Sequence, residues 1–142
     1  MKHKASITQT YLKRDREAIP HLFRVAKSLA PYPTTTKQLF EIAASLPCDQ
    51  YYISDDAALS YFRNRRFHNR VVRFKNPFKQ RLFDAFYDEV TSMMAQDRYK
   101  GVSVRDAVIC SLSRPAPCIG LTPFVMYRTF IRQAKKRQNH KP

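Results

Sequence analysis

The residues best suited to chemistry in this sequence are cations near its end, in the stretch TPFVMYRTFIRQAKK. At 100° per residue, one face of a helix here carries Arg128, Arg132, Lys135 and Lys136. Another face carries Phe124, Tyr127, Phe130, Ile131 and Ala134, which we expect to be buried. Such a helix can contact phosphates and, in a major groove, guanine edges. Favourable interaction with the helix dipole is an alternative explanation for part of the positive stripe.

A second basic cluster lies in the middle of the chain. Between Ala57 and Phe83 there are eight cations and no acid, and six of the eight are arginines, whose planar guanidinium pairs bidentately with phosphate. Aromatic residues interleave with them and could stack on bases, although packing in the core is the alternative. The predicted nucleic-acid-binding residues are Arg63, Arg65, Arg66, Arg70, Arg73, Lys75, Arg128, Arg132, Lys135 and Lys136.

The overall charge favours the same class of partner. The chain has 26 Lys and Arg against 11 Asp and Glu, a net charge of +15, and such an excess is typical of proteins that bind a polyanion. No apolar run approaches the roughly 20 residues of a membrane span, so we expect no membrane partner. The N-terminal stretch lacks the apolar core of a signal peptide, which favours a cytoplasmic location.

Signatures of catalysis and of metal binding are missing from the sequence. It contains no glycine-rich phosphate loop, no H-E-x-x-H motif and no nucleophile elbow. The adjacent acids Asp55 and Asp56 fit the first turn of a helix better than a metal site. The three cysteines lack C-x-x-C spacing and the four histidines are scattered, so we expect free thiols. The sequence therefore predicts a protein that is not an enzyme and has no metal or cofactor.

The elements that must position these cations are predicted to be helices. Only 2 glycines accompany 9 prolines, which argues against a protein of sheets and hairpins. Cap residues predict where helices begin: Thr35 with Gln38, Ser54, Asn76 before Pro77, Ser103 with Asp106, and Thr122 before Pro123. A first helix is expected over 15–30, with Pro20 as an exception inside it. We expect an all-α, compact domain of about six helices.

These marks recur when the sequence is shifted by 68 positions. Thr35 then coincides with Ser103, Ser54 with Thr122, and Phe62 with Phe130. The correspondence suggests an internal duplication of a helix–turn–helix-like unit. The predicted organisation is a basic N-terminal arm (1–14), one helical domain (15–137) and a tail (138–142). The domain would contain two similar units, about 15–67 and 76–137, around a central helix over 76–96.

The stretches IGLTPFVMYRTFIRQ and YYISDDAALSYFRNR resemble the second helix of helix-turn-helix DNA-binding units. That resemblance implies that the residues after the cap face the groove, here Arg128 and Arg132 in one unit and Arg63 and Arg65 in the other. The turns are longer than the 3–4 residues usual in that family. The SRPAP stretch and its capped helix also resemble small basic proteins of gut-bacterial mobile elements.

From the sequence we expect a small, basic, non-enzymatic nucleic-acid-binding protein: a regulator, an architectural protein or an accessory factor. The alternative is an accessory protein-interaction subunit of a larger RNA–protein or replication assembly. In that case the basic faces would contact structural RNA or an acidic protein.

Overall fold

The structure is a computed structural model, and it describes residues 9–32 and 34–139. The expectation of an all-α fold is confirmed: the described part of the chain contains six α-helices and no strand. The α-helices are α2 (Ile19–Leu29), α3 (Thr36–Ser45), α4 (Asp55–Phe67), α5 (Pro77–Met94), α6 (Val104–Leu112) and α7 (Pro123–Asn139). A π-helical turn, η1 (Arg14–Ala18), precedes α2, and a 3-10 turn, η2 (Asp97–Tyr99), follows α5.

The helices begin at the predicted cap residues. Thr35 and Gln38 form a complete capping box: the Gln38 N–H donates to Thr35 Oγ1 at 3.1 Å and the Thr35 N–H donates to Gln38 Oε1 at 2.9 Å. Four further caps accept backbone N–H groups of their first turns through side-chain oxygens: Ser54, Asn76, Ser103 and Thr122. Local chemistry thus fixes where each of α3 to α7 starts.

The first helix starts earlier than predicted. Residues 9–13 are already helical and continue through η1 into α2, so the expected arm over 1–14 is helical from residue 9. The remainder of that arm, 1–8, lies outside the described residues. Pro20 lies inside this helix, just after η1, where the Ile19 N–H donates to the Arg14 carbonyl five residues back. This wider turn accommodates a residue that has no N–H and crowds the preceding turn.

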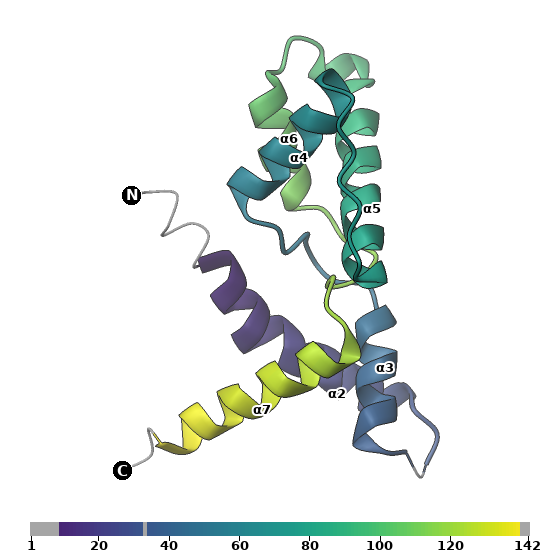
Figure 1. Cartoon of the computed structure of the whole chain (residues 1–142), viewed down its shortest axis with the longest axis vertical. Coiled ribbons are helices and arrows are strands. Elements are labelled where there is room, and N and C mark those ends of the chain that lie inside the picture. The colour runs from purple at the N-terminus through teal and green to yellow at the C-terminus, as the bar shows by residue number, and fades with distance from the viewer. Residues whose placement is uncertain (1–8, 33, 140–142) are drawn as a thin grey trace.

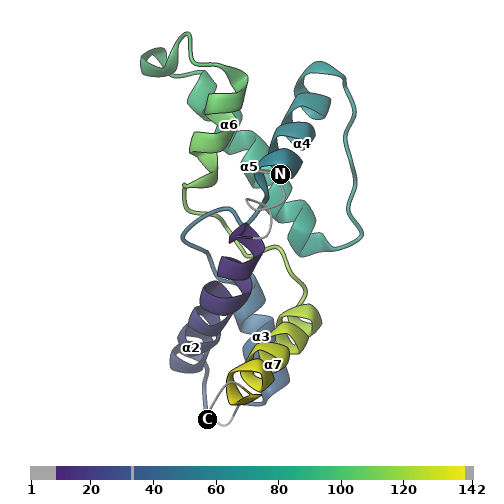
Figure 2. The ribbon, with the colours of Figure 1, turned by 90° about the vertical axis from the view of Figure 1, so that its left-hand side faces the viewer.

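The helices gather into two lobes (Figure 1, Figure 2). In the first lobe α3 packs against α2 and α7; in the second lobe α6 packs against α5 and α4. Each lobe therefore takes one helix from the other half of the chain. This grouping differs from the two consecutive units expected over 15–67 and 76–137. It also makes α5 a helix of the second lobe rather than the centre of both.

The exchange of helices occurs where two linkers, residues 46–54 and 113–122, pass each other. Cys48 and Ala116 form an antiparallel bridge in which each backbone N–H donates to the other carbonyl, at 2.9 and 3.0 Å. These two positions are 116 − 48 = 68 residues apart, the same shift that relates the cap residues. Equivalent positions of the two halves thus meet at the crossing.

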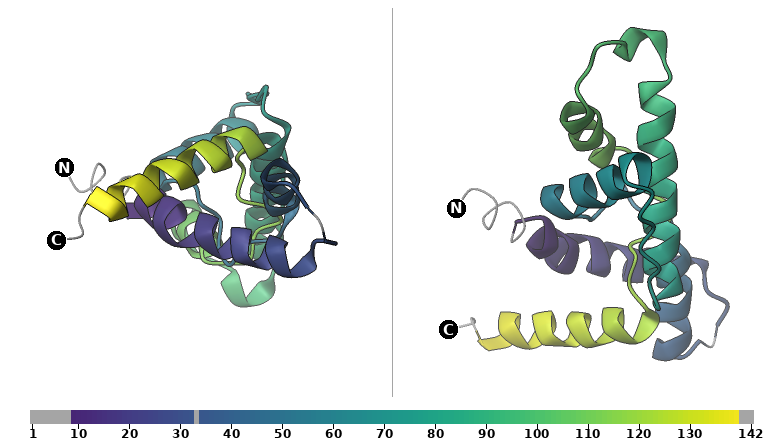
Figure 3. Two further views of the ribbon diagram at one scale, coloured as in Figure 1. Left: turned by 90° about the horizontal axis from the view of Figure 1, so that it is seen from below. Right: turned by 45° about the horizontal axis from the view of Figure 1, so that its top comes forward.

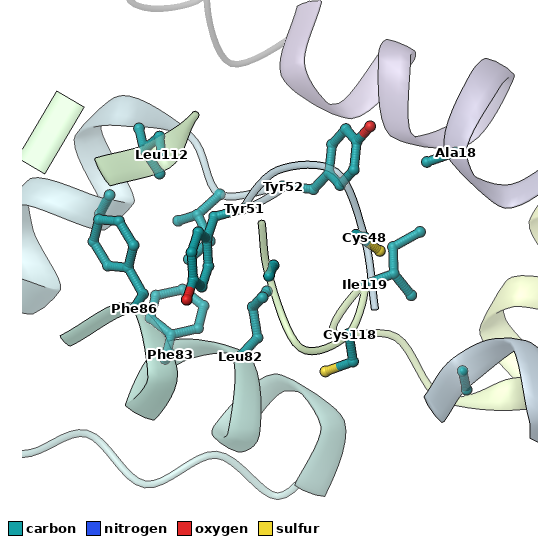
Figure 4. Packing of buried hydrophobic residues seen from close by; sticks show 14 of the residues in the cluster. Ala18, Cys48, Tyr51, Tyr52, Leu82, Phe83, Phe86, Leu112, Cys118 and Ile119 are labelled. Atoms are coloured by element: carbon teal, nitrogen blue, oxygen red, sulfur yellow. The ribbon is translucent and has the colours of Figure 1, made fainter. Parts of the chain in front are cut away.

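The linkers form part of the hydrophobic core (Figure 4). Tyr51 and Ile119 are buried, and the Tyr51 ring packs edge-on against Phe86 of α5 with centroids 5.2 Å apart. Burial, followed by the nearby Cys118 and Asp49, raises the pKa of the Cys48 thiol to about 12. Because both linkers are anchored in the core, the helices that they lead into have fixed starting points.

Candidate nucleic-acid interface

The stripe of cations predicted on the last helix faces solvent. Arg128, Arg132, Lys135 and Lys136 are all exposed on α7. The Arg128 guanidinium lies over the ring of Phe124, 5.5 Å from its centroid. Among the described residues, ion pairs engage Lys13, Arg14, Arg65 and Arg114, and none of the α7 cations. Their charge is therefore available to an external anion.

The buried face of α7 is not the predicted one. Met126, Thr129 and Gln133 are buried, whereas Phe124 and Tyr127 are 66% and 42% exposed. The predicted core residue Phe130 does contact the first lobe: its ring lies 4.8 Å from that of Phe23 and 5.6 Å from that of Phe40. The helix meets its neighbours along 126, 129, 130 and 133, a spacing of i, i+3, i+4 and i+7. Two polar side chains are buried as a result, and two aromatic ones are left outside.

The second basic cluster extends from the end of α4 through an extended segment, residues 68–76, to the start of α5 (Figure 1). The exposed cations of this region include Arg63, Arg66, Arg70, Arg73 and Lys75. The segment is held near its end by Phe74, whose ring packs 4.8 Å from that of Phe83 and whose N–H donates to Gln80 Oε1 at 2.8 Å. Arg70, Arg73 and Lys75 thus lie on a segment with a defined path, and Arg63 and Arg66 lie on α4.

Arg65 is the exception among the predicted site residues, because the fold uses its guanidinium. Nη1 donates to Asp84 Oδ1 at 3.0 Å and to the Tyr61 hydroxyl at 3.1 Å. The guanidinium also lies over the Tyr87 ring, 4.0 Å from the centroid. These contacts tie α4 to α5, so we exclude Arg65 from the candidate interface. Sequence spacing could not separate it from its exposed neighbours because Asp84 is 19 positions away.

The segments that carry the two basic clusters are linked at the start of α5. Asn76 Nδ2 donates to the Gly120 carbonyl, two residues before the cap of α7, at 3.2 Å. Gly120 has a φ of +86°, and a Cβ at this position would lie 2.6 Å from Leu82 Cδ2. Segment 68–76 lies in front of α5 and α7 in front of α2 in Figure 1, and both are on the right in Figure 2. The segment 68–76 and α7, which carry cations of the two clusters, therefore lie on one side of the molecule.

The two helix-turn-helix-like stretches differ in this setting. Neither forms its main helix pair from consecutive helices, because α3 packs against α7 and α6 against α4. The first turn of α4 carries Asp55 and Asp56, whereas the equivalent turn of α7 carries Pro123 and Phe124. Along its whole length α7 carries exposed cations and no acid, so α7 is the better candidate for contact with nucleic acid.

A third basic region was not predicted from the sequence. It is a surface hollow of about 560 Å³ between the first helix, the 47–52 linker and the end of α7. Figure 3 shows α7 and the first helix in the first lobe from two directions. The basic side chains and histidine that line it are Lys13, Arg16, His21, Arg24 and Arg137; Glu17 and Asp49 also line it. The sequence signal is the recurrence of Arg16 and Arg24 on one helix, eight residues apart.

The described residues also bear on metal binding and on membrane crossing. In the part of the chain that the structure describes, no group of three or more His, Cys, Asp or Glu side chains could hold a metal ion. None of the described helices combines the length and apolarity needed to cross a bilayer. Comparison with protein-family models, with curated proteins and with solved structures finds no match for this chain.

Proposed function

We propose that this protein binds nucleic acid, without catalysis, as a regulator, an architectural protein or an accessory factor. The observation that carries the proposal is the exposure of two basic clusters, on segments that the Asn76–Gly120 hydrogen bond links at the start of α5. The exposed cations assigned to this interface are Arg63, Arg66, Arg70, Arg73, Lys75, Arg128, Arg132, Lys135 and Lys136. The free thiols Cys48, Cys110 and Cys118 are consistent with work in a reducing compartment such as the cytoplasm.

Binding through these cations should depend steeply on salt, since each neutralised phosphate releases counterions. With nine exposed cations, about six phosphate contacts would give a log–log slope near −5 on B-DNA, from roughly −0.9 per contact. Fluorescence anisotropy of labelled duplex DNA and of a structured RNA, between about 50 and 200 mM salt, measures this slope. A slope shallower than about −2 would show that the charge is not an interface.

Two pairs of substitutions that change the net charge equally test whether the interface includes α7. The changes Arg128→Gln with Arg132→Gln, and Lys100→Gln with Arg105→Gln, each lower the net charge by two, from +15 to +13. Lys100 and Arg105 are exposed and lie outside both clusters. If α7 contacts phosphates, the first pair should reduce the magnitude of the slope by about 2 and the second should leave it unchanged. Equal effects of both pairs would contradict the assignment of the site to α7.

A second candidate function is that of an accessory subunit that requires a protein partner. The favouring observation is that Val71 and Val72 are 45% and 46% exposed on the extended 68–76 segment. Adjacent apolar side chains that are exposed on an extended segment can be covered by a partner protein. This candidate predicts that Val71→Ser with Val72→Ser abolishes capture of a specific protein from the native cell, while binding of the purified protein to nucleic acid is retained.

A further inference from the structure

The start of α7 forms one wall of an apolar groove whose other wall is the start of α3. The groove has a volume of about 690 Å³ and is lined by Thr36, Lys37, Glu41, Thr122, Pro123, Phe124 and Tyr127. Its apolar surface comes from Pro123 and the two aromatic rings. The Tyr127 ring packs edge-on against the ring of the buried Phe40, with 5.6 Å between the centroids. The groove is therefore an aromatic surface held in place by the core.

The two aromatic rings of the groove are exposed, whereas polar side chains on the same helix are buried in the core. On the same helix Thr129 is 4% exposed and Gln133 is 7% exposed, whereas Phe124 is 66% exposed. An ordinary amphipathic helix would bury the aromatic residues and expose the polar ones. This inversion means that packing of the lobe does not explain Phe124.

The charges around the groove restrict what can occupy it. The Arg128 guanidinium lies over the Phe124 ring at 5.5 Å, and Lys37 stands on the α3 side. Glu41, an exposed acid, also lines the groove and disfavours an anion inside it. The fitting ligand is a flat group with apolar faces that enters the groove, attached to an anion that stays beside Arg128.

The other half of the chain lacks this arrangement. At the positions 68 residues earlier, α4 has Asp56 in place of Phe124 and Leu59 in place of Tyr127. The two helices are otherwise placed alike, each capped by a hydroxyl residue after a linker from the core. The aromatic pair is thus a feature of α7 alone and is not required by this type of lobe.

We propose that this groove binds an unpaired nucleobase of the nucleic acid, stacked on Phe124 and Tyr127, with its phosphate beside Arg128. The inference rests on the proposed function and makes it more specific, since bases in an intact duplex are stacked on each other and cannot enter. Aromatic side chains beside cations are the usual means of holding single strands. The ligand is single-stranded DNA or RNA, or an unpaired base in a folded RNA.

The affinity test compares single-stranded DNA, single-stranded RNA and duplex DNA of one length. Phe124→Ala should weaken binding of a single strand about tenfold, a typical effect of losing one stacked base, and leave duplex binding unchanged. The matched control is Tyr32→Ala, because Tyr32 is 98% exposed and does not line the groove. If Phe124→Ala weakens binding of only one of the two single strands, that strand shows whether the site accepts deoxyribose or ribose.

A fluorescence test reports on stacking directly. The sequence contains no tryptophan, so Phe124→Trp introduces a single indole into the groove and keeps an aromatic ring there. We expect this variant to retain single-strand affinity and its emission to be quenched by the oligonucleotide. The emission of the control variant Tyr32→Trp should not change.

The outcomes separate this inference from the proposed function. If the emission of Phe124→Trp is unchanged at saturation while Arg128→Gln with Arg132→Gln still weakens binding, the base site is wrong and the basic interface stands. If neither Phe124→Ala nor Arg128→Gln with Arg132→Gln weakens binding, both the base site and the basic interface are wrong. If Phe124→Ala alters the oligomeric state but not single-strand binding, a second copy covers the groove and the base site is again wrong.

Discussion

Gly120 offers the sharpest test of how the entry to α7 is built. Its φ of +86° is one that side-chain-bearing residues rarely adopt, and an added Cβ would lie 2.6 Å from Leu82 Cδ2. For Gly120→Ala the backbone conformation costs about 1–2 kcal/mol. The clash with a buried leucine adds about 1–3 kcal/mol, so the total loss of unfolding free energy should be about 2–5 kcal/mol.

Gly101 provides the matched control. Its φ is +88°, nearly the same, but nothing lies within 4 Å of a Cβ built there. Gly101→Ala should therefore lose only the backbone contribution of about 1–2 kcal/mol. Urea unfolding of both variants and the parent measures the difference, which isolates the contact with Leu82. Equal destabilisation of the two variants would refute the close approach between Gly120 and Leu82.

A double-mutant cycle tests the same contact independently. Leu82 is buried, and Leu82→Ala alone should cost about 2–5 kcal/mol. It also removes the atom that an alanine at position 120 would meet. The double variant should thus be more stable than the sum of the single effects predicts, by about 1–3 kcal/mol. Strict additivity would show that the linker moves aside and that the entry to α7 is not fixed.

Three further predictions concern the core and the thiols. Phe130→Ala should cost about 3 kcal/mol in urea unfolding, the low end for a phenylalanine in a core, while Phe124→Ala should cost under about 0.5 kcal/mol. Native protein should react rapidly with a thiol reagent only at the exposed Cys110, and denatured protein also at Cys48 and Cys118. Because the pKa of Cys48 is higher in the folded protein, this thiol contributes to the free energy of unfolding. The contribution is fully present below pH 9.0, the ordinary pKa, and is lost as the pH rises toward about 12. Cys48→Ala should therefore reduce the loss of unfolding free energy between those two pH values.

Helix starts could be read from the sequence because a cap is a local arrangement. Thr35, Ser54, Asn76, Ser103 and Thr122 all bond the turn that follows them, and no distant residue is needed for that bond. The 68-residue spacing of the caps was visible for the same reason. The helical stretch over residues 9–13 was not predicted, because basic residues without an acid favoured an arm over 1–14.

The buried face of α7 and the role of Arg65 depended on distant partners. The side of α7 that is buried depends on the position of Phe40. Phe40 lies on α3, which ends 78 residues before α7 begins. Arg65 is removed from the candidate interface by Asp84 of α5. Local periodicity identifies an apolar or basic face but not the element that meets it, so the exchange of helices between the lobes could not be predicted.

That exchange also describes how a shorter chain would behave. A protein of half this length with the same helix pattern would complete its three-helix lobes by pairing with a second copy. The residue at position 48 would then bridge to itself across a true two-fold axis. Within one chain the two halves are joined covalently, so they need not be identical. One half can keep Asp55 and Asp56 at the start of α4, while the other places Phe124 at the equivalent turn of α7.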